Sequence, residues 1–461
     1  MSSKNETSIL VATLFITLAI IGGGVWFLNK LLNAGNSSFS KGEIRTELKQ
    51  NISTGSTILV PSANNEAKQF AAKAIAEGKK NEAIQQLSDY LQRVPNDPEA
   101  LIYLNNLRAI DHDPLNIAVV APVGSSLNVA QEILRGTAQA QMEINQQGGI
   151  KGRFLRITLV NDANQTAIAQ EVAQALVKTP EIVAVVGHNA SSASLSAAPI
   201  YQTGELVMIT PTSFANGITD IGNYIFRVVP NVSVAAKSLV QQVSKRHQKI
   251  AVCSDSQAPD AVSFYQEFTA NLLAAGRQLV PTVCDLNAPV LNAPLKIQEA
   301  LNSGADGLLL LPHVDRLVKA YDMAAANQGR LQLYGNSTLF TIKTLEQGKA
   351  MQGLIIAVPW SSKNRVNRPF AQAARQLWGG DVSWRTAGAY DAVYAVANGL
   401  KVGQTRQTLQ RALAQPTFVS KTINGDVSFL PNGDRQGQAI IVQVQTAPSH
   451  VTGYDFTPIA P

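Results

Sequence analysis

The feature that most restricts the fold of this chain is a regular alternation of apolar strands and amphipathic helices from Leu115 onward. The run NIAVVAPV is continuously apolar, which is typical of a buried parallel strand, and residues 129–146 have the period of an amphipathic helix. FLRITLVND predicts the next strand, residues 167–178 the next helix and IVAVVG the third strand. Seven further strand-like runs follow: LVMITP, YIFRVVP, KIAVCSD, QLVPTVCD, GLLLLP, LQLYGNS and GLIIAVPW.

This alternation predicts an α/β fold with parallel sheets flanked by helices on both faces. The region from Leu115 to Pro461 has about 350 residues, which is long for a single core, so we expect two lobes. The chain is 45% apolar and only 15% charged, which is enough to build both cores.

Residues 9–28 form an uncharged stretch, ILVATLFITLAIIGGGVWFL. As a helix, such a stretch extends about 30 Å and can cross a bilayer core. We interpret residues 1–30 as an uncleaved transmembrane anchor. A cleaved signal peptide is the alternative, but little positive charge precedes the stretch and no A-x-A site follows it. The basic residues between Lys30 and Lys49 argue against an extracytoplasmic main domain under the positive-inside rule.

Residues 31–63 are rich in Ser, Asn, Gly and Thr and predict a linker. In residues 64–110 apolar side chains recur at helical spacing, and Gly78 and Pro95 separate the helices. The pattern resembles one tetratricopeptide repeat plus one further helix, fewer than the roughly three repeats that a free solenoid needs. A surface that docks a peptide and a helical spacer packed on the next domain are both open, and the spacer is favoured because nothing marks a peptide-binding face.

In parallel α/β sheets a ligand binds beyond the carboxyl ends of the strands. The segments at these ends are rich in hydroxyl and amide side chains and poor in acids, which suits binding better than catalysis. They are PVGSSLN, GHNASSAS, TPTSFANG, SDSQAPD, LPHVD, YGNSTLF and VPWSS.

A family resemblance rests on the order and spacing of several segments. NIAVVAPVGSSLNVAQEILRGTAQAQMEINQQGGIKGRFLRITLVND resembles the start of a type I periplasmic solute-binding protein of the Leu/Ile/Val-binding branch. VAVVGHNASSASLSAAPIYQTGELVMITPTSF, NYIFRVVP and GAYDAVYAVANGL continue the resemblance to about residue 450. It implies a periplasmic-binding-protein domain over 115–461 with three crossovers. Lobe 1 would take 115–230 and 360–426, and lobe 2 would take 231–359 and 427–461.

The resemblance also implies a function. It predicts an extracytoplasmic, membrane-anchored solute-binding protein of an ABC transporter. Its partners would be a permease and a small polar ligand, namely an amino acid or a similar compound, an amide or an organic anion. A sensory or envelope-assembly module with the same fold is the alternative.

The candidate ligand-binding residues follow from the strand ends and from the resemblance. In amino-acid-binding relatives, the serine matching Ser191 and the end of the next strand hold the ligand, although a serine after a strand is also a common helix cap. The full set comprises Ser125, Ser191, Ser192, Thr212, Ser213, Phe214, His313, Asn336, Tyr390 and Asp391. His313 can equally be an exposed or capping residue, and Tyr390 with Asp391 a structural pair.

Three positions depart from the family pattern. The family has threonine where Phe214 stands, Tyr-Gly at Pro259–Asp260, and a glutamate that grips the ligand ammonium at Ser337. Phe214 could instead stack on an aromatic or apolar ligand. An ammonium in a dry cleft needs an acid, so the loss at Ser337 puts a standard amino acid in doubt unless Tyr390 and Asp391 compensate.

Other classes of function lack support in the sequence. The net charge is +6, but the basic residues are scattered, so no nucleic-acid partner is expected. There is no P-loop and no GxSxG elbow, and the five histidines are far apart, so we expect neither an enzyme nor a cofactor or metal. The two cysteines, Cys253 and Cys284, end successive strands; a disulfide and two buried thiols are equally open.

Overall fold

A computed structural model describes residues 50–61 and 66–460 of the chain. The chain divides into two units, 1–50 and 51–461, and the description below concerns the second. The predicted anchor at residues 9–28 lies outside the described residues. Across the two described ranges, no helix is both long and apolar enough to cross a membrane.

The first sheet has six strands in the order β1-β3-β2-β4-β5-β6. All neighbours are parallel except β1, which pairs antiparallel with β3. The strands are β1 (Ile52–Ser53), β2 (Leu115–Ala121), β3 (Leu155–Asn161), β4 (Ile182–Val186), β5 (Val207–Thr210) and β6 (Ile225–Arg227).

The second sheet has seven strands in the order β15-β14-β11-β10-β9-β7-β8, and its last two strands along the chain are antiparallel. The strands are β7 (Lys249–Ser254), β8 (Gln278–Asp285), β9 (Gly307–Leu311), β10 (Gln332–Gly335), β11 (Ile355–Val358), β14 (Ile440–Thr446) and β15 (Tyr454–Pro458). A separate hairpin joins β12 (Ser420–Thr422) to β13 (Gly425–Val427).

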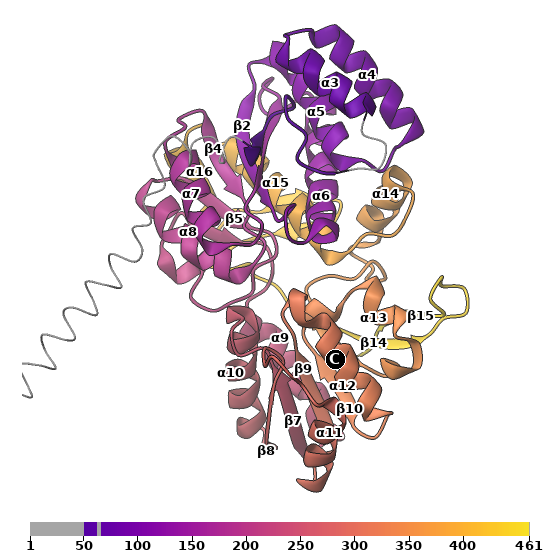
Figure 1. Cartoon of the computed structure of the whole chain (residues 1–461). Helices are drawn as coiled ribbons and strands as arrows, with labels where there is room; N and C mark the ends of the chain where they lie inside the picture. Colours follow the sequence, from indigo (N-terminus) through magenta and orange to yellow (C-terminus); the bar gives the residue numbers. More distant parts are fainter. Residues whose placement is uncertain (1–49, 62–65, 461) are drawn as a thin grey trace, which may run out of the picture. The chain divides into compact units, whose positions relative to one another are not determined.

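The helices of lobe 1 come from two separate stretches of the chain (Figure 1). They are α3 (Glu66–Ala76), α4 (Lys80–Arg93), α5 (Pro98–Ala109), α6 (Leu127–Gln146), α7 (Thr166–Val177), α8 (Ser191–Thr203), α14 (Arg368–Trp378), α15 (Trp384–Leu400) and α16 (Arg406–Leu413).

Lobe 2 holds the remaining α-helices of the described chain. They are α9 (Val232–Ser244), α10 (Pro259–Ala274), α11 (Ala293–Asn302), α12 (Leu317–Asn327) and α13 (Ile342–Glu346). Short 3-10 turns lie at η1 (Ile110–His112), η2 (Thr219–Ile221), η3 (Val314–Arg316), η4 (Ser337–Leu339) and η5 (Gly348–Ala350).

The ten strand-like runs predicted from Leu115 onward correspond to β2 through β11. Strand β9 shows why such runs are continuously apolar. Leu308 and Leu310 belong to the core on the α11–α12 side of the sheet, whereas Leu309 and Leu311 belong to the core on the α9–α10 side (Figure 1). Because successive side chains point to opposite faces, a sheet covered on both faces needs apolar residues throughout. The antiparallel pair β14 and β15 was not predicted.

The N-terminal helices form part of lobe 1. Residues 64–110 were predicted to be helical, and α3, α4 and α5 lie there, with α5 packed on α6 and β3. The Asn106 side chain on α5 donates to the Ile157 carbonyl at 2.8 Å and accepts from the Ile157 amide at 2.8 Å. It thus satisfies backbone groups on the outer side of β3, where the short edge strand β1 pairs with only two residues. The predicted linker therefore ends before Asn51, because residues 51–61 are attached to this lobe.

The chain passes between the lobes three times: between β6 and α9, after β11, and before β14. The last passage lies later than the predicted boundary at residue 427. Phe429 still packs in the lobe 1 core, and Asp434 accepts a hydrogen bond from buried Arg227 at 2.5 Å. Trp360, beside the second passage, is buried and donates to Asn424 at 2.6 Å, so it packs at the hinge.

Cys253 and Cys284 are register partners in β7 and β8, their Cα atoms are 4.5 Å apart, and they form a disulfide. We expect the double substitution Cys253→Ala/Cys284→Ala to lower the free energy of unfolding by about 2–4 kcal/mol, because the bond no longer restricts the unfolded chain. Denaturant titration measures this loss. Wild-type protein in excess reductant should match the variant, and an unchanged midpoint would contradict the prediction.

Candidate functional site

The cleft between the lobes contains two adjoining cavities, of about 160 and 40 Å3, which share Ser191, Asp260 and His313. Nearly all of the other lining residues follow the carboxyl ends of β4, β5, β7, β8, β9 and β10. This is the position at which parallel sheets of this kind bind ligands.

The lobe 1 wall includes the start of helix α8. The helix begins without a side-chain cap, so its first N–H groups are available to an anion, which the helix dipole also favours. The Ser191 hydroxyl oxygen accepts hydrogen bonds from the amides of Phe214 and Ala215, at 3.2 and 3.3 Å. With its oxygen occupied in this way, the Ser191 hydroxyl can donate its proton to a ligand.

Helix α15 supplies a buried cation to the smaller cavity. Arg385 is only 7% exposed, and its guanidinium lies 4.4 Å from the centre of the Trp384 ring. Burial lowers the pKa of Arg385 to about 10, although the charges of Glu132 and Asp260 raise it in part, so the group stays cationic at neutral pH. No salt bridge joins this guanidinium to an acid of the described chain.

The position of Arg385 follows from the way α15 begins. Ser383 caps the helix by accepting from the Arg385 amide at 3.2 Å. Glu132 on α6 accepts from the Ser383 amide at 3.1 Å and from the Thr386 hydroxyl at 2.6 Å. Two glycines allow the close packing. A Cβ at Gly136 would lie 2.0 Å from the Thr386 carbonyl oxygen, and one at Gly388 would lie 2.5 Å from the carbonyl oxygen of Pro211.

We expect Gly388→Ala to weaken ligand binding and to lower the free energy of unfolding by about 1–3 kcal/mol, the usual cost of overpacking. The added methyl group would separate α15, which carries Arg385, from the loop after β5. Calorimetric titration and denaturant unfolding measure the two effects. Gly380→Ala is the control, because a Cβ there meets nothing within 4 Å. Equal behaviour of the two variants would contradict the prediction.

Lobe 2 contributes an acid, Asp260, in the first turn of α10. Burial raises the pKa of its carboxyl, and the charge of Asp255 adds to this, whereas the charge of His313 and backbone N–H groups act in the opposite direction. No salt bridge joins Asp260 to a cation of the described chain. The carboxylate therefore faces the cavity with an incompletely balanced charge.

His313 lies in both cavities, beside Asp260. Burial lowers its pKa, but the hydrogen bond with Asp315 and the charges of Asp260, Asp315 and Asp255 outweigh burial, so the pKa is raised. Its Nδ1 lies 3.4 Å from an Asp315 carboxylate oxygen. The lobe 2 side of the cleft thus carries acids with a titratable cation between them.

The structure brings five of the ten predicted site residues together in the cleft lining. These five are Ser191, Ser192, Thr212, Phe214 and His313. The Thr212 hydroxyl donates to Asn189 at 3.0 Å, and the Phe214 ring packs edge-on against Trp384 with centroids 5.3 Å apart.

The other five lie outside the lining of these two cavities. Tyr390 donates to Glu143 at 2.5 Å inside lobe 1, and Asp391 pairs with Arg435 at 2.9 Å near the last passage between the lobes. Ser213 is buried and shares a hydrogen bond with Ser194 at 2.7 Å. Ser125 is exposed, and Asn336 is buried one residue before η4.

Several cleft residues were missed as candidates, above all Asp260, Trp384 and Arg385. From the sequence, Asp260 is only a departure from the family pattern. The family glutamate is replaced by Ser337 in this chain. Asp260, on a different element, provides a carboxylate to the cleft instead. The sequence did contain a signal for this position. Asp260 directly follows Pro259 at an expected helix start after a strand, and such strand ends are where ligands bind.

A protein-family model described as "Periplasmic binding protein" matches residues 114–448. The chain belongs to the periplasmic binding protein family. The curated relatives of this family member include the Leu/Ile/Val-binding protein of Escherichia coli, which is 32% identical over 164 residues. That match covers 34% of this chain and 43% of the relative, so the chain matches less than half of that protein.

Solved structures agree with the family at the level of the fold. An ABC transporter substrate-binding protein from Desulfitobacterium hafniense in complex with Leu aligns with a TM-score of 0.63 and 20% identity, over 75% of this chain and 100% of that chain. A solute-binding protein from R. palustris in complex with 4-hydroxybenzoate aligns with a TM-score of 0.65 and 18% identity, over 75% and 96%. The two-lobe fold of periplasmic binding proteins is therefore confirmed.

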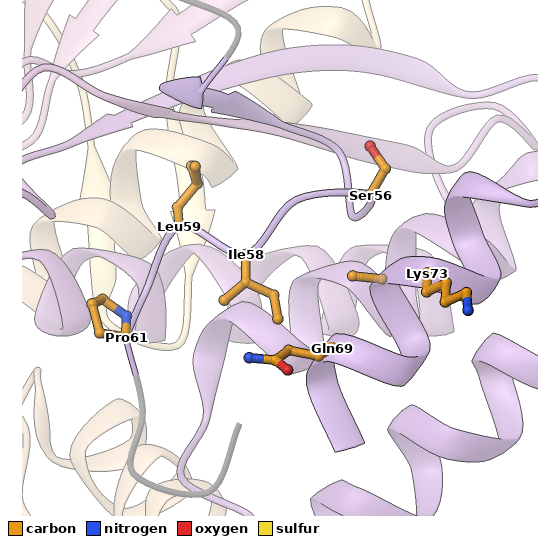
Figure 2. Close-up of a pocket in the computed structure, with 7 residues that line it drawn as sticks. Ser56, Ile58, Leu59, Pro61, Gln69 and Lys73 are labelled. Carbon is orange, nitrogen blue, oxygen red and sulfur yellow. The ribbon is translucent and has the colours of Figure 1, made fainter. Parts of the chain in front are cut away.

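Outside the cleft, a further cavity of about 500 Å3 lies between residues 56–61 and helix α3. Figure 2 shows Ile58, Leu59 and Pro61 on the segment 56–61 and Gln69 and Lys73 on helix α3. It borders residues 62–65, which lie outside the described chain, and we assign no function to it. Within the described ranges, no group of three or more His, Cys, Asp or Glu residues is placed to hold a metal ion.

Proposed function

We propose that this chain is a solute-binding protein that captures a small amino-acid-like ligand between its lobes and delivers it to an ABC-type permease. One observation carries the proposal. Arg385 from lobe 1 and Asp260 from lobe 2 line the same small cavity, and neither is neutralised by a salt bridge within the described chain.

A ligand with both a carboxylate and an amino group complements this pair. Charges removed from water are costly unless they are paired, so a zwitterion that bridges the lobes would stabilise the closed arrangement over the open one. Closure about the three connecting segments is the hinge motion by which such proteins trap ligands. The α8 N-terminus and Ser191 add donors for the carboxylate.

The relatives support this ligand class. Their names and complexes include Leu/Ile/Val, Leu and 4-hydroxybenzoate, all of which carry a carboxylate. The apolar stretch at residues 9–28 supports a membrane anchor that would hold the main domain outside the cytoplasm and near its permease.

A thermal-shift screen of the full-length chain in detergent tests the proposal. The panel comprises amino acids, small peptides, amides, ureas and organic anions. A true ligand at about 100 times its dissociation constant adds about 2.7 kcal/mol of stability and raises the melting temperature. The double variant Asp260→Asn/Arg385→Gln should lose the shift. A flat screen over well-folded protein would reject the proposal and favour a sensory or envelope-assembly module.

A further inference from the structure

Two separate groups in the smaller cavity are suited to bind a carboxylate. The first is the uncapped start of α8 together with the Ser191 hydroxyl, whose oxygen already accepts two amide hydrogen bonds. The second is the guanidinium of Arg385, which belongs to a different helix and is only 7% exposed. A zwitterion with one carboxylate can bind one of these groups but leaves the other without a ligand carboxylate; at Arg385, only the more distant charges of Glu132 and Asp260 would then act on the guanidinium.

The arrangement of Arg385 supports its role as a separate anion site. Its guanidinium carbon lies over the Trp384 ring, and a guanidinium without a salt bridge can bind a carboxylate through two parallel hydrogen bonds. Trp384 is in turn fixed edge-on by Phe214. A ligand that placed a neutral or apolar group opposite this buried guanidinium would bind more weakly. The N–H donors of the guanidinium would lose their hydrogen bonds to water and gain no acceptor in return.

Asp260 supplies the third charged position. It faces the same cavity from lobe 2 and is suited to an ammonium group. We propose that the cleft selects an amino acid with a second carboxylate, that is, an acidic amino acid. Its ammonium binds Asp260, one carboxylate binds the α8 start with Ser191, and the other binds Arg385. This inference rests on the proposed function and specifies its ligand.

Calorimetric titration of the full-length chain with L-glutamate, L-aspartate, L-glutamine, L-leucine and L-lysine tests the inference. Glutamate and glutamine are the critical pair, because they have nearly the same shape and differ by one charge. We expect glutamate or aspartate to bind at least about 30-fold more tightly than glutamine, the usual effect of losing one hydrogen-bonded charge.

Variants of the proposed second anion site provide the matched comparison. Arg385→Gln should lower the affinity for the acidic amino acid by about 30-fold and that for glutamine by less than about threefold, so that the preference disappears. Arg385→Lys keeps the charge and should retain part of the preference. Arg375→Gln, at an arginine whose side chain is 69% exposed, should change nothing.

Two results would overturn the inference. If glutamine, leucine or lysine binds as tightly as the acidic amino acids, and Arg385→Gln weakens all of them equally, Arg385 holds the only carboxylate, and the proposed function stands without this ligand class. If neither these amino acids nor the wider panel bind to folded protein, the proposed function itself fails.

Discussion

Asp260→Asn is expected to weaken ligand binding at least about 30-fold, because removing one partner of a buried charge pair costs about 2–5 kcal/mol. The substitution keeps the shape of the side chain but removes the charge that faces the ligand ammonium. The empty protein should not lose stability. Burial raises the pKa of the Asp260 carboxyl, which means that its ionised form is disfavoured in the folded state.

Calorimetric titration and denaturant unfolding of the same variant measure both effects. Asp322→Asn is the matched control, since Asp322 is an exposed residue of α12 in the same lobe. Unchanged affinity in Asp260→Asn would show that the ligand amino group binds elsewhere. A large loss of stability would instead show that Asp260 has a structural role.

Binding should also depend on pH through Asp260. Only the ionised carboxylate pairs with an ammonium, so affinity is complete above the raised pKa of Asp260 and falls as the pH drops through it. His313, which faces Asp260 and also has a raised pKa, gains positive charge as the pH falls and adds to the loss. Asp255 and Arg385 are the other charged groups that act on Asp260. Titrations across the acidic range should show a flatter profile in Asp260→Asn, and identical profiles would contradict this prediction.

The second large effect is expected in the N-terminal helices. Lys68→Met should lower the free energy of unfolding of this region by about 3–5 kcal/mol, the usual cost of breaking a buried ion pair. The Lys68 ammonium is 2.9 Å from Asp97 and 2.7 Å from Glu99, and all three side chains are buried. Glu99 also accepts from the amides of Leu59 and Val60, so the cluster joins residues 51–61 to the helices.

Hydrogen exchange over residues 51–109 and denaturant unfolding measure the loss. Lys73→Met provides the control on the same helix, because Lys73 is 73% exposed and its ion pair with Glu77 spans 3.9 Å. Adding Asp97→Asn and Glu99→Gln to Lys68→Met should recover part of the stability, since no buried charge is then left unpaired. Equal protection in Lys68→Met and Lys73→Met would show that the cluster contributes little.

The series of strands along the chain and the location of the cleft could be predicted because they depend on local patterns. Runs such as GLLLLP identify strands buried on both faces, and the rule that ligands bind at strand ends then applies. The disulfide remained open because it depends on the register of β7 with β8. Strand β1 was missed because a two-residue strand has no periodicity of its own.

The charged residues of the site were harder to predict because they meet only in the folded chain. Asp260 and Arg385 are far apart in sequence and come from different lobes. On α15, Tyr390 faces Glu143 and Asp391 faces Arg435, whereas Trp384 and Arg385 at the helix start line the cleft. The rotation of this helix is set by its close contact with α6 at Gly136, which cannot be read from a single helical segment.

The attachment of residues 51–53 to strand β3 has a mechanical consequence. Asn161 donates its amide to the Asn51 carbonyl at 2.8 Å, and Ile52 and Ser53 pair with Val160 and Leu159. A force applied through the preceding chain would therefore be borne by the β1–β3 pair and by lobe 1. The three connecting segments between the lobes would carry no load. Lobe 2 could therefore rotate about them while lobe 1 stays tethered.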